Sequence, residues 1–178
     1  MNDKTLAADP RAAGPARFRQ GMRCLAGSVT VVAQQSAGGT LAGVTATAVC
    51  SLSAAPPSLI ACINTASALA QGLIEGASFS VNILSEHQED IARAFGGQKG
   101  LSGRDRFVYG EWYRSDDGVP LLAGSRASFE CRVASFIDYG SHRATIGLVL
   151  DIYMSDEADA TLLFADGRFV TVGGNAAA

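Results

Sequence analysis

The chain has 178 residues, of which 48% are hydrophobic and 17% charged, and its formal net charge is −3. This length predicts one domain that buries roughly 70% of its unfolded surface, and the negative charge excludes a general electrostatic attraction to nucleic acid. No stretch approaches about 18 uninterrupted apolar residues, so we expect no membrane span. The N-terminal residues also lack the apolar core of a secretory signal.

The first half of the chain predicts a tail, a helix and a series of short strands. Residues 1–14 are rich in Ala, Pro and Gly and are expected to form a flexible tail. After Pro15, the helical spacing of Phe18, Met22 and Leu25 predicts a short amphipathic helix. Further along, the pattern predicts strands at 28–35 and 58–64 with a return strand between them, a short helical segment at 67–75, and a strand at 79–84.

The second half predicts long paired strands. Ser85 and Gln88 form a capping-box pattern that predicts the start of a helix. Alternating apolar residues predict two antiparallel strands at 126–138 and 142–154. The remaining expectations are a glycine-rich loop at 96–107, an irregular segment at Trp112 and Tyr113, a final hairpin of 161–164 and 168–172 that turns at Asp166-Gly167, and a tail at 173–178.

About seven strands with two or three helices predict a mainly β protein, a closed or partly closed antiparallel barrel with helices at its ends. No linker divides the chain, so we expect one domain at 15–172. The four cysteines are widely spaced, which predicts reduced, buried cysteines in a cytoplasmic protein. With only two histidines and no clustering of ligand residues, no metal site is expected.

The stretch from Gly43 to Asn64 has an unusual composition. Its first half, including Thr45 to Ala48, is built of small residues that fill a core poorly but allow something else to approach the backbone. One interpretation is a wall of a ligand site. The other is a hairpin of small residues packed against a neighbouring sheet. These residues alone leave both interpretations open.

Two other features also have two interpretations. The segment 96–107 contains Lys99, Arg104 and Arg106, which are available to a phosphate group if the loop holds an anion, and are otherwise solvated. His142 follows a turn between two long strands and is either a solvated, structural residue or a polar group that contacts a ligand.

Several catalytic motifs are absent. The chain has no G-x-G-x-x-G, no P-loop and no G-x-S-x-G. Asp138, Ser141 and His142 are crowded on one turn, whereas a hydrolytic triad is usually assembled from separate segments. If the protein is an enzyme, a bound cofactor is therefore expected to carry the reaction.

Six segments between residues 18 and 150 together resemble the flavin reductase-like, split-barrel family, the small components of two-component flavin-dependent monooxygenases. They follow the family's order, although no single motif among them is highly specific. The segments are FRQGMRCLAGSVTVV, GVTATAVCSLSAAPPSLIACIN, FSVNILS, the IARAFGG…DRF region, SFECRV and YGSHRATIG.

The resemblance implies a homodimer of split barrels that binds FMN or FAD near the subunit interface. It implies hydride transfer from NADH or NADPH to the flavin, and a separate monooxygenase that receives the reduced flavin. His142 corresponds to a position near the flavin and the nicotinamide. The implied cofactor-binding residues are Thr45, Ala46, Thr47, Ala48, Ser51, Cys62, Ile63, Asn64, Ser67, Phe95, Lys99, Arg104 and Arg106.

Two positions depart from the family pattern. Many relatives have Gly-Asp-His where this chain has Gly140-Ser141-His142, and Ser-Ser where it has Thr47-Ala48. Ser141 therefore supplies no carboxylate beside His142, and Ala48 offers only its backbone. The alternatives to a flavin reductase are a non-enzymatic flavin-binding protein, a flavoprotein that reduces a bound organic substrate, and a β-barrel interaction module without a ligand.

Overall fold

A computed structural model describes residues 11–36, 38–156 and 159–173. The predicted tails at 1–14 and 173–178 therefore lie largely outside the described residues. The helices are α1 (Pro15–Met22), α2 (Ala68–Gly72) and α3 (Glu89–Phe95), with short 3-10 helices η1 (Glu86–Gln88) and η2 (Gly103–Val108). No helix among the described residues is long and apolar enough to cross a membrane.

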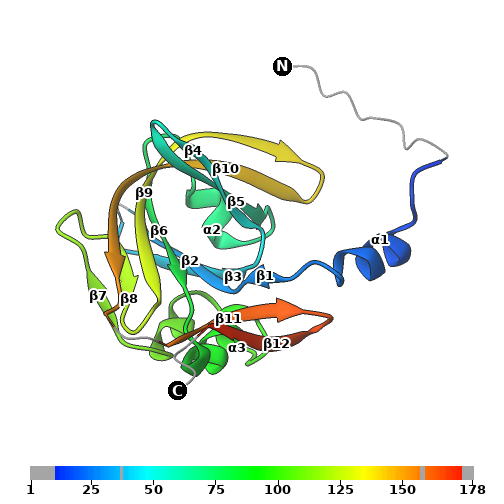
Figure 1. Cartoon of the computed structure of the whole chain (residues 1–178). Helices are drawn as coiled ribbons and strands as arrows, with labels where there is room; N and C mark the ends of the chain where they lie inside the picture. The colour runs from blue at the N-terminus through cyan, green and yellow to red at the C-terminus, as the bar shows by residue number, and fades with distance from the viewer. Residues whose placement is uncertain (1–10, 37, 157–158, 174–178) are drawn as a thin grey trace.

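A seven-stranded antiparallel sheet with the order β3-β2-β6-β9-β10-β5-β4 forms the body of the protein and curls into a barrel (Figure 1). A second sheet has the order β1-β11-β12, and β7 pairs with β8. The strands are β1 (Gly27–Ser28), β2 (Thr30–Gln35), β3 (Leu41–Ala46), β4 (Val49–Ala54), β5 (Pro57–Asn64), β6 (Ser78–Ile83), β7 (Trp112–Arg114), β8 (Pro120–Leu122), β9 (Ala127–Tyr139), β10 (His142–Met154), β11 (Ala160–Ala165) and β12 (Arg168–Gly173).

The β9–β10 hairpin connects the two halves of the large sheet, since β9 pairs with β6 and β10 pairs with β5. Bulges interrupt its register between Ile146 and Gly147 and again between Val149 and Asp151. Bulges bend the strand that carries them and increase its twist, which helps a sheet to close on itself. The first bulge also brings Gly147 onto Phe79 of the core, where a Cβ on Gly147 would lie 2.6 Å from the ring.

Two clusters of buried side chains support this arrangement. One fills the barrel and is centred on Phe79, Ile63 and Leu69. The other lies between the large sheet and α3, where Phe95 packs with Val31 and Leu162. The clusters lie on either side of β2, because its successive side chains point to opposite faces of the sheet.

The strand predictions for the long hairpin, for β2–β3 and for the Asp166-Gly167 turn are confirmed. The turn has φ of 51° at Asp166 and 78° at Gly167, which is the conformation of a tight hairpin. Three expectations need correction. Trp112 and Tyr113 form strand β7 rather than an irregular segment, because β8 pairs with them. The expected loop at 96–107 contains most of η2.

The cysteine prediction is the third, and it is wrong for two residues. Cys24 and Cys50 are exposed, Cys62 is half-buried, and only Cys131 is buried. All four are free thiols, as expected. Cys24 follows α1, a helix without a buried residue, and Cys50 lies on β4, the last strand of the large sheet. Burial raises the pKa of the Cys131 thiol to about 12.

Candidate functional site

A trough of about 240 Å³ lies where β3, β5 and β10 meet at one end of the barrel. One wall is the turn from β3 into β4, and the facing wall is the end of β5 with the first residue of β10. The residues that line the trough are Val44, Thr45, Ala46, Thr47, Ala48, Cys62, Ile63, Asn64 and His142. The fold therefore brings together eight of the fourteen predicted site residues, which are separated by up to about a hundred positions in sequence.

Hydrogen bonds from neighbouring elements hold the backbone of the turn wall in place. Thr30 donates its hydroxyl to the carbonyl of Ala46 at 2.8 Å, and Thr45 donates its hydroxyl to the carbonyl of Ala92 in α3 at 2.7 Å. Ala48 accepts a backbone hydrogen bond from Cys62 at 2.9 Å, which fixes the distance between the two walls. The trough is therefore formed by restrained backbone and small side chains.

His142 reaches the trough because β10 begins there. Its backbone pairs with Asn64 of β5, and its ring Nδ1 lies 2.9 Å from the hydroxyl of Ser141. Thr65 donates both its backbone N–H and its hydroxyl to the carbonyl of Ser141, at 3.0 and 3.1 Å. Ser141, which stands where many relatives have Asp, is thus in direct contact with the histidine.

Arg143 anchors this hairpin tip to the body of the protein. Its guanidinium binds both carboxylate oxygens of Asp138 at 2.7 and 2.9 Å and lies over the ring of Phe136. The same group donates to the carbonyls of Ala70 and Leu73, at the end of α2. The guanidinium also holds the pKa of Asp138 below its ordinary value. Because Arg143 directly follows His142, these contacts hold the backbone beside the histidine in place.

A second cavity of about 330 Å³ lies on the other side of the turn wall, and Thr47 and Ala48 line both. Its remaining walls are α1 with the segment after it, and the β11–β12 turn. The lining residues are Arg19, Met22, Arg23, Leu25, Gly27, Thr47, Ala48, Phe164, Ala165, Asp166 and Gly167. A Cβ on Gly27 would lie 3.1 Å from the carbonyl oxygen of Thr47, so a side chain there would crowd the wall.

The chemistry of the trough fits a planar, polar ring such as the isoalloxazine of a flavin. Ala46 and Ala48 offer no bulk that would hold a ring away from the backbone. The side-chain amide nitrogen of Asn64 has no partner among the described residues, whereas its Oδ1 accepts from Ala66 at 2.9 Å. His142 supplies a ring nitrogen at the rim. Flat apolar surface with a few polar groups at its edge is typical of cofactor sites.

Six predicted site residues lie outside this trough. Ser51 lines a separate cavity of about 320 Å³ at β4, and Ser67 caps α2 by accepting from Ala70 at 3.2 Å. Phe95 is buried against Phe107 and Trp112.

The three cations of the 96–107 segment also lie elsewhere. Lys99 forms an ion pair with Asp90 at 2.9 Å, and Arg104 lines a cavity on the outer side of the barrel. Arg106 donates to three backbone carbonyls, including that of Gly43 at 3.1 Å. The guanidinium of Arg106 thus braces β3 from behind the trough wall.

Apart from Thr47 and Ala48, sequence reasoning missed the residues of the second cavity. Arg19 and Arg23 are spaced one helical turn apart, which is a usable signal of a basic face. The proximity of Asp166 had no such signal, because it depends on the pairing of β11 with β1 and on the hydrogen bond from the Asp166 N–H to the carbonyl of Arg23.

Comparison with known proteins bears on the same region. The model of the flavin reductase like domain matches residues 22–173. A protein named FMN reductase (NADH) RutF 1 from Methylorubrum extorquens is 40% identical over 157 residues, which cover 88% of this chain and 76% of the relative.

Solved structures agree with this match. A Streptomyces globisporus NADH:FAD oxidoreductase, SgcE6, in complex with NAD and FAD fragments, has a TM-score of 0.79 at 28% identity and covers 90% of this chain and 94% of its own. BorF, the flavin reductase component of a bacterial two-component tryptophan halogenase, has a TM-score of 0.81 at 25% identity, covering 91% of this chain and all of its own. The chain therefore belongs to the flavin reductase-like family and has its split-barrel fold.

Proposed function

We propose that this protein is an NADH-dependent flavin reductase that binds FMN or FAD in the trough. The observation that carries the proposal is the trough itself, where small side chains, Asn64 and His142 converge on one surface in a chain of this family. The similarity to proteins named FMN reductase (NADH) favours NADH as the reductant and FMN as the flavin. A bound flavin would supply the redox chemistry, accepting a hydride from the reduced nicotinamide.

The residues of the chain contribute position rather than acid–base chemistry. The Thr45–Ala48 wall and the Cys62–Asn64 wall hold the ring between them, and the contact between Cys62 and Ala48 sets their separation. Thr47 and Ala48 face both cavities, so the second cavity lies close enough to receive the other reactant. Holding two reactants in a fixed orientation accounts for a large part of the rate enhancement in such reactions.

His142 has a defined role in this proposal. A Ser141 hydroxyl that donates to Nδ1 places the ring proton on Nε2, because a neutral imidazole carries one N–H. The Nε2–H is then a donor for the carboxamide oxygen of the nicotinamide. In relatives an aspartate beside the histidine would favour a proton on Nδ1, whereas the Ser141 hydroxyl can donate to Nδ1 or accept from it and so also permits the tautomer with its proton on Nε2.

The decisive assay is NADH oxidation measured in turn with FMN, FAD and riboflavin. We expect turnover with FMN, and a His142→Ala variant whose KM for NADH rises more than its Kd for flavin. A His142→Gln variant, which keeps an N–H donor, should recover part of the loss. Equal losses for NADH and flavin in His142→Ala, or no loss in either, would exclude this role. A protein that binds flavin without oxidising NADH would be the non-enzymatic alternative.

The same proposal includes a homodimer. The described chain leaves several large apolar side chains exposed on β4 and β10, including Leu52, Ile152 and Met154, and the edge of β4 has no pairing strand. Helix α1 extends from the barrel (Figure 1), and Phe18 on the helix and Leu25 in the segment after it are exposed. Exposed apolar patches of this kind mark protein interfaces. Light scattering should give twice the mass of the chain, and an Ile152→Asp variant should give the mass of one chain.

We also infer that reduced flavin passes to a separate oxygenase, as expected for a relative of two-component flavin reductases. The support is the open trough, which is lined by exposed residues such as Ala48 and Asn64 and lets a flavin leave. Purified protein should therefore lose its flavin on gel filtration. Tight retention of the flavin would instead favour a flavoprotein that reduces a bound organic substrate.

A further inference from the structure

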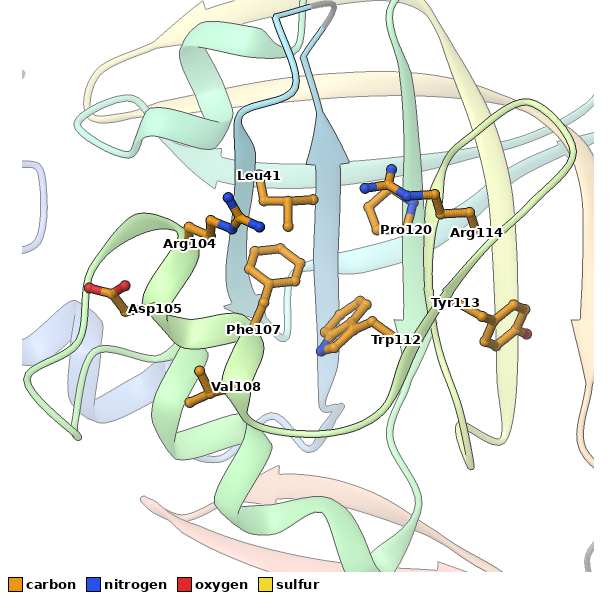
Figure 2. Close-up of a pocket in the computed structure, with 9 residues that line it drawn as sticks. All are labelled: Leu41, Arg104, Asp105, Phe107, Val108, Trp112, Tyr113, Arg114 and Pro120. Carbon is orange, nitrogen blue, oxygen red and sulfur yellow. The ribbon is translucent and has the colours of Figure 1, made fainter.

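A cavity of about 390 Å³, here called the outer cavity, opens between η2, β3 and the β7–β8 hairpin (Figure 2). It shares no lining residue with the trough or with the second cavity beside α1. Leu41 of the outer cavity and Val44 of the trough lie three positions apart on β3, so the two sites are separated by roughly 10 Å along the strand. The residues that line the outer cavity are Leu41, Arg104, Asp105, Phe107, Val108, Trp112, Tyr113, Arg114 and Pro120.

Aromatic rings form a rigid surface in this cavity. The rings of Phe107 and Trp112 are 4.8 Å apart, and both pack on the buried ring of Phe95, at 5.0 and 5.5 Å. The indole N–H of Trp112 donates to the carbonyl of Tyr109 at 2.9 Å, which fixes the ring orientation. The aromatic surface is therefore in place before a ligand arrives, and little rotamer entropy is lost on binding.

Two guanidinium groups lie beside these rings. Figure 2 shows Arg104 from η2 and Arg114 from β7 on either side of Leu41 and Pro120, with the rings of Phe107 and Trp112 below them in this view.

The two arginines differ in their contacts. Arg114 is held by Gln35 and by the carbonyl of Gly118. Arg104 is exposed and has no hydrogen-bond or ion-pair partner among the described residues. With Asp105 as the one acidic lining residue, the cavity carries a net positive charge.

We propose that the outer cavity binds a planar aromatic ring that carries an anionic group, either a carboxylate or a phosphate. The ring stacks on Phe107 and Trp112, and the anion receives the N–H groups of Arg104 in the paired geometry that guanidinium offers to both anions. Cavities of about 300 Å³ and more accommodate small organic ligands. This site is independent of the proposed flavin chemistry, because none of its residues lines the trough.

The chain contains one tryptophan, so the indole N–H of Trp112 gives a single, isolated cross-peak in a proton–nitrogen correlation spectrum. We expect benzoate or phenyl phosphate to shift this cross-peak, and the relative affinities of the two identify the preferred anion. Benzyl alcohol, which keeps the ring, and cyclohexanecarboxylate, which keeps the charge, should each bind at least about tenfold more weakly.

Two variants complete the test. Arg104→Gln should weaken the affinity for the bound anion about tenfold, since it removes a charge-assisted pair. The matched control Arg168→Gln removes an exposed arginine from β12 and should change nothing at Trp112.

Three results would overturn the proposal. They are the absence of a shift with both anions at millimolar concentration, a benzyl alcohol affinity equal to that of benzoate, and unchanged affinity in Arg104→Gln.

Discussion

Replacing Arg143 with Met should destabilise the protein far more than its place at the tip of a hairpin suggests. The methionine keeps the aliphatic stem but removes every donor, so the carbonyls of Ala70 and Leu73 lose their side-chain partner. Both residues are almost fully buried, and the Arg143 side chain is only 15% exposed. Leaving a buried carbonyl unsatisfied costs about 1–3 kcal/mol. If each carbonyl costs an amount in the lower half of that range, the two together lower the free energy of unfolding by about 3 kcal/mol.

The assay is thermal unfolding at one fixed protein concentration, because the proposed association of subunits would make Tm depend on concentration. For a chain of this size, about 3 kcal/mol corresponds to a fall in Tm of roughly 6–12 °C. We also expect kcat/KM for NADH to fall, since the loss of Arg143 frees the hairpin tip that carries His142.

The matched control is Asp138→Asn. It weakens the ion pair but leaves Arg143 bound to the two carbonyls, and the Asp138 side chain is 50% exposed. Exposed ion pairs contribute little to stability, so this variant should lower Tm by much less than Arg143→Met. A fall in Tm as large as that of Arg143→Met would show that the ion pair, and not the carbonyl contacts, holds the tip. An unchanged Tm in Arg143→Met would refute the reasoning altogether.

Three further predictions concern the core and the ionisable groups. Gly147→Ala should cost about 1–3 kcal/mol in unfolding free energy, because its Cβ would lie 2.6 Å from the ring of Phe79, whereas Gly21→Ala, in helix α1 with open space around it, should stabilise by up to about 1 kcal/mol. Cys131, whose pKa is about 12, should resist thiol reagents until the protein unfolds, as followed by mass spectrometry. Arg143 lowers the pKa of Asp138 below 3.8, so the stabilisation from this ion pair is fully present above pH 3.8 and is lost as the pH falls through the lowered pKa. The difference in Tm between the native chain and Asp138→Asn should therefore vanish at pH values below the lowered pKa of Asp138.

The sequence predicted those strands whose residues alternate between the barrel interior and the outside. In the β9 region, Phe129, Cys131 and Val133 alternate with polar residues, and the strand pairs with β10 as expected, whereas its pairing with β6 was not predicted. Periodicity could not predict β7, because Trp112 and Tyr113 form a strand only through pairing with β8. Such short elements depend on partners that are distant in sequence.

The position of the site was more predictable than its supports. The small residues of the turn wall could be named because their residue types depart from what a core needs, and His142 could be named through the family resemblance. The anchoring role of Arg143 could not be predicted, since it depends on the end of α2 lying beneath the hairpin tip. The cations of the 96–107 segment were predicted from composition alone, and composition does not reveal that Arg106 donates to backbone carbonyls.

The small residues of the turn wall form one side of the trough and one side of a packed interface at the same time. Behind the wall, a Cβ on Gly43 would lie 2.7 Å from the ring of Phe95 and 3.3 Å from that of Phe107. In front of it, Ala46 and Ala48 leave the trough open. The two interpretations of this stretch, a ligand wall and a closely packed hairpin, therefore do not exclude each other. A wall only one backbone thick has to be small on both sides, since a larger residue on either side would displace the backbone that shapes the trough.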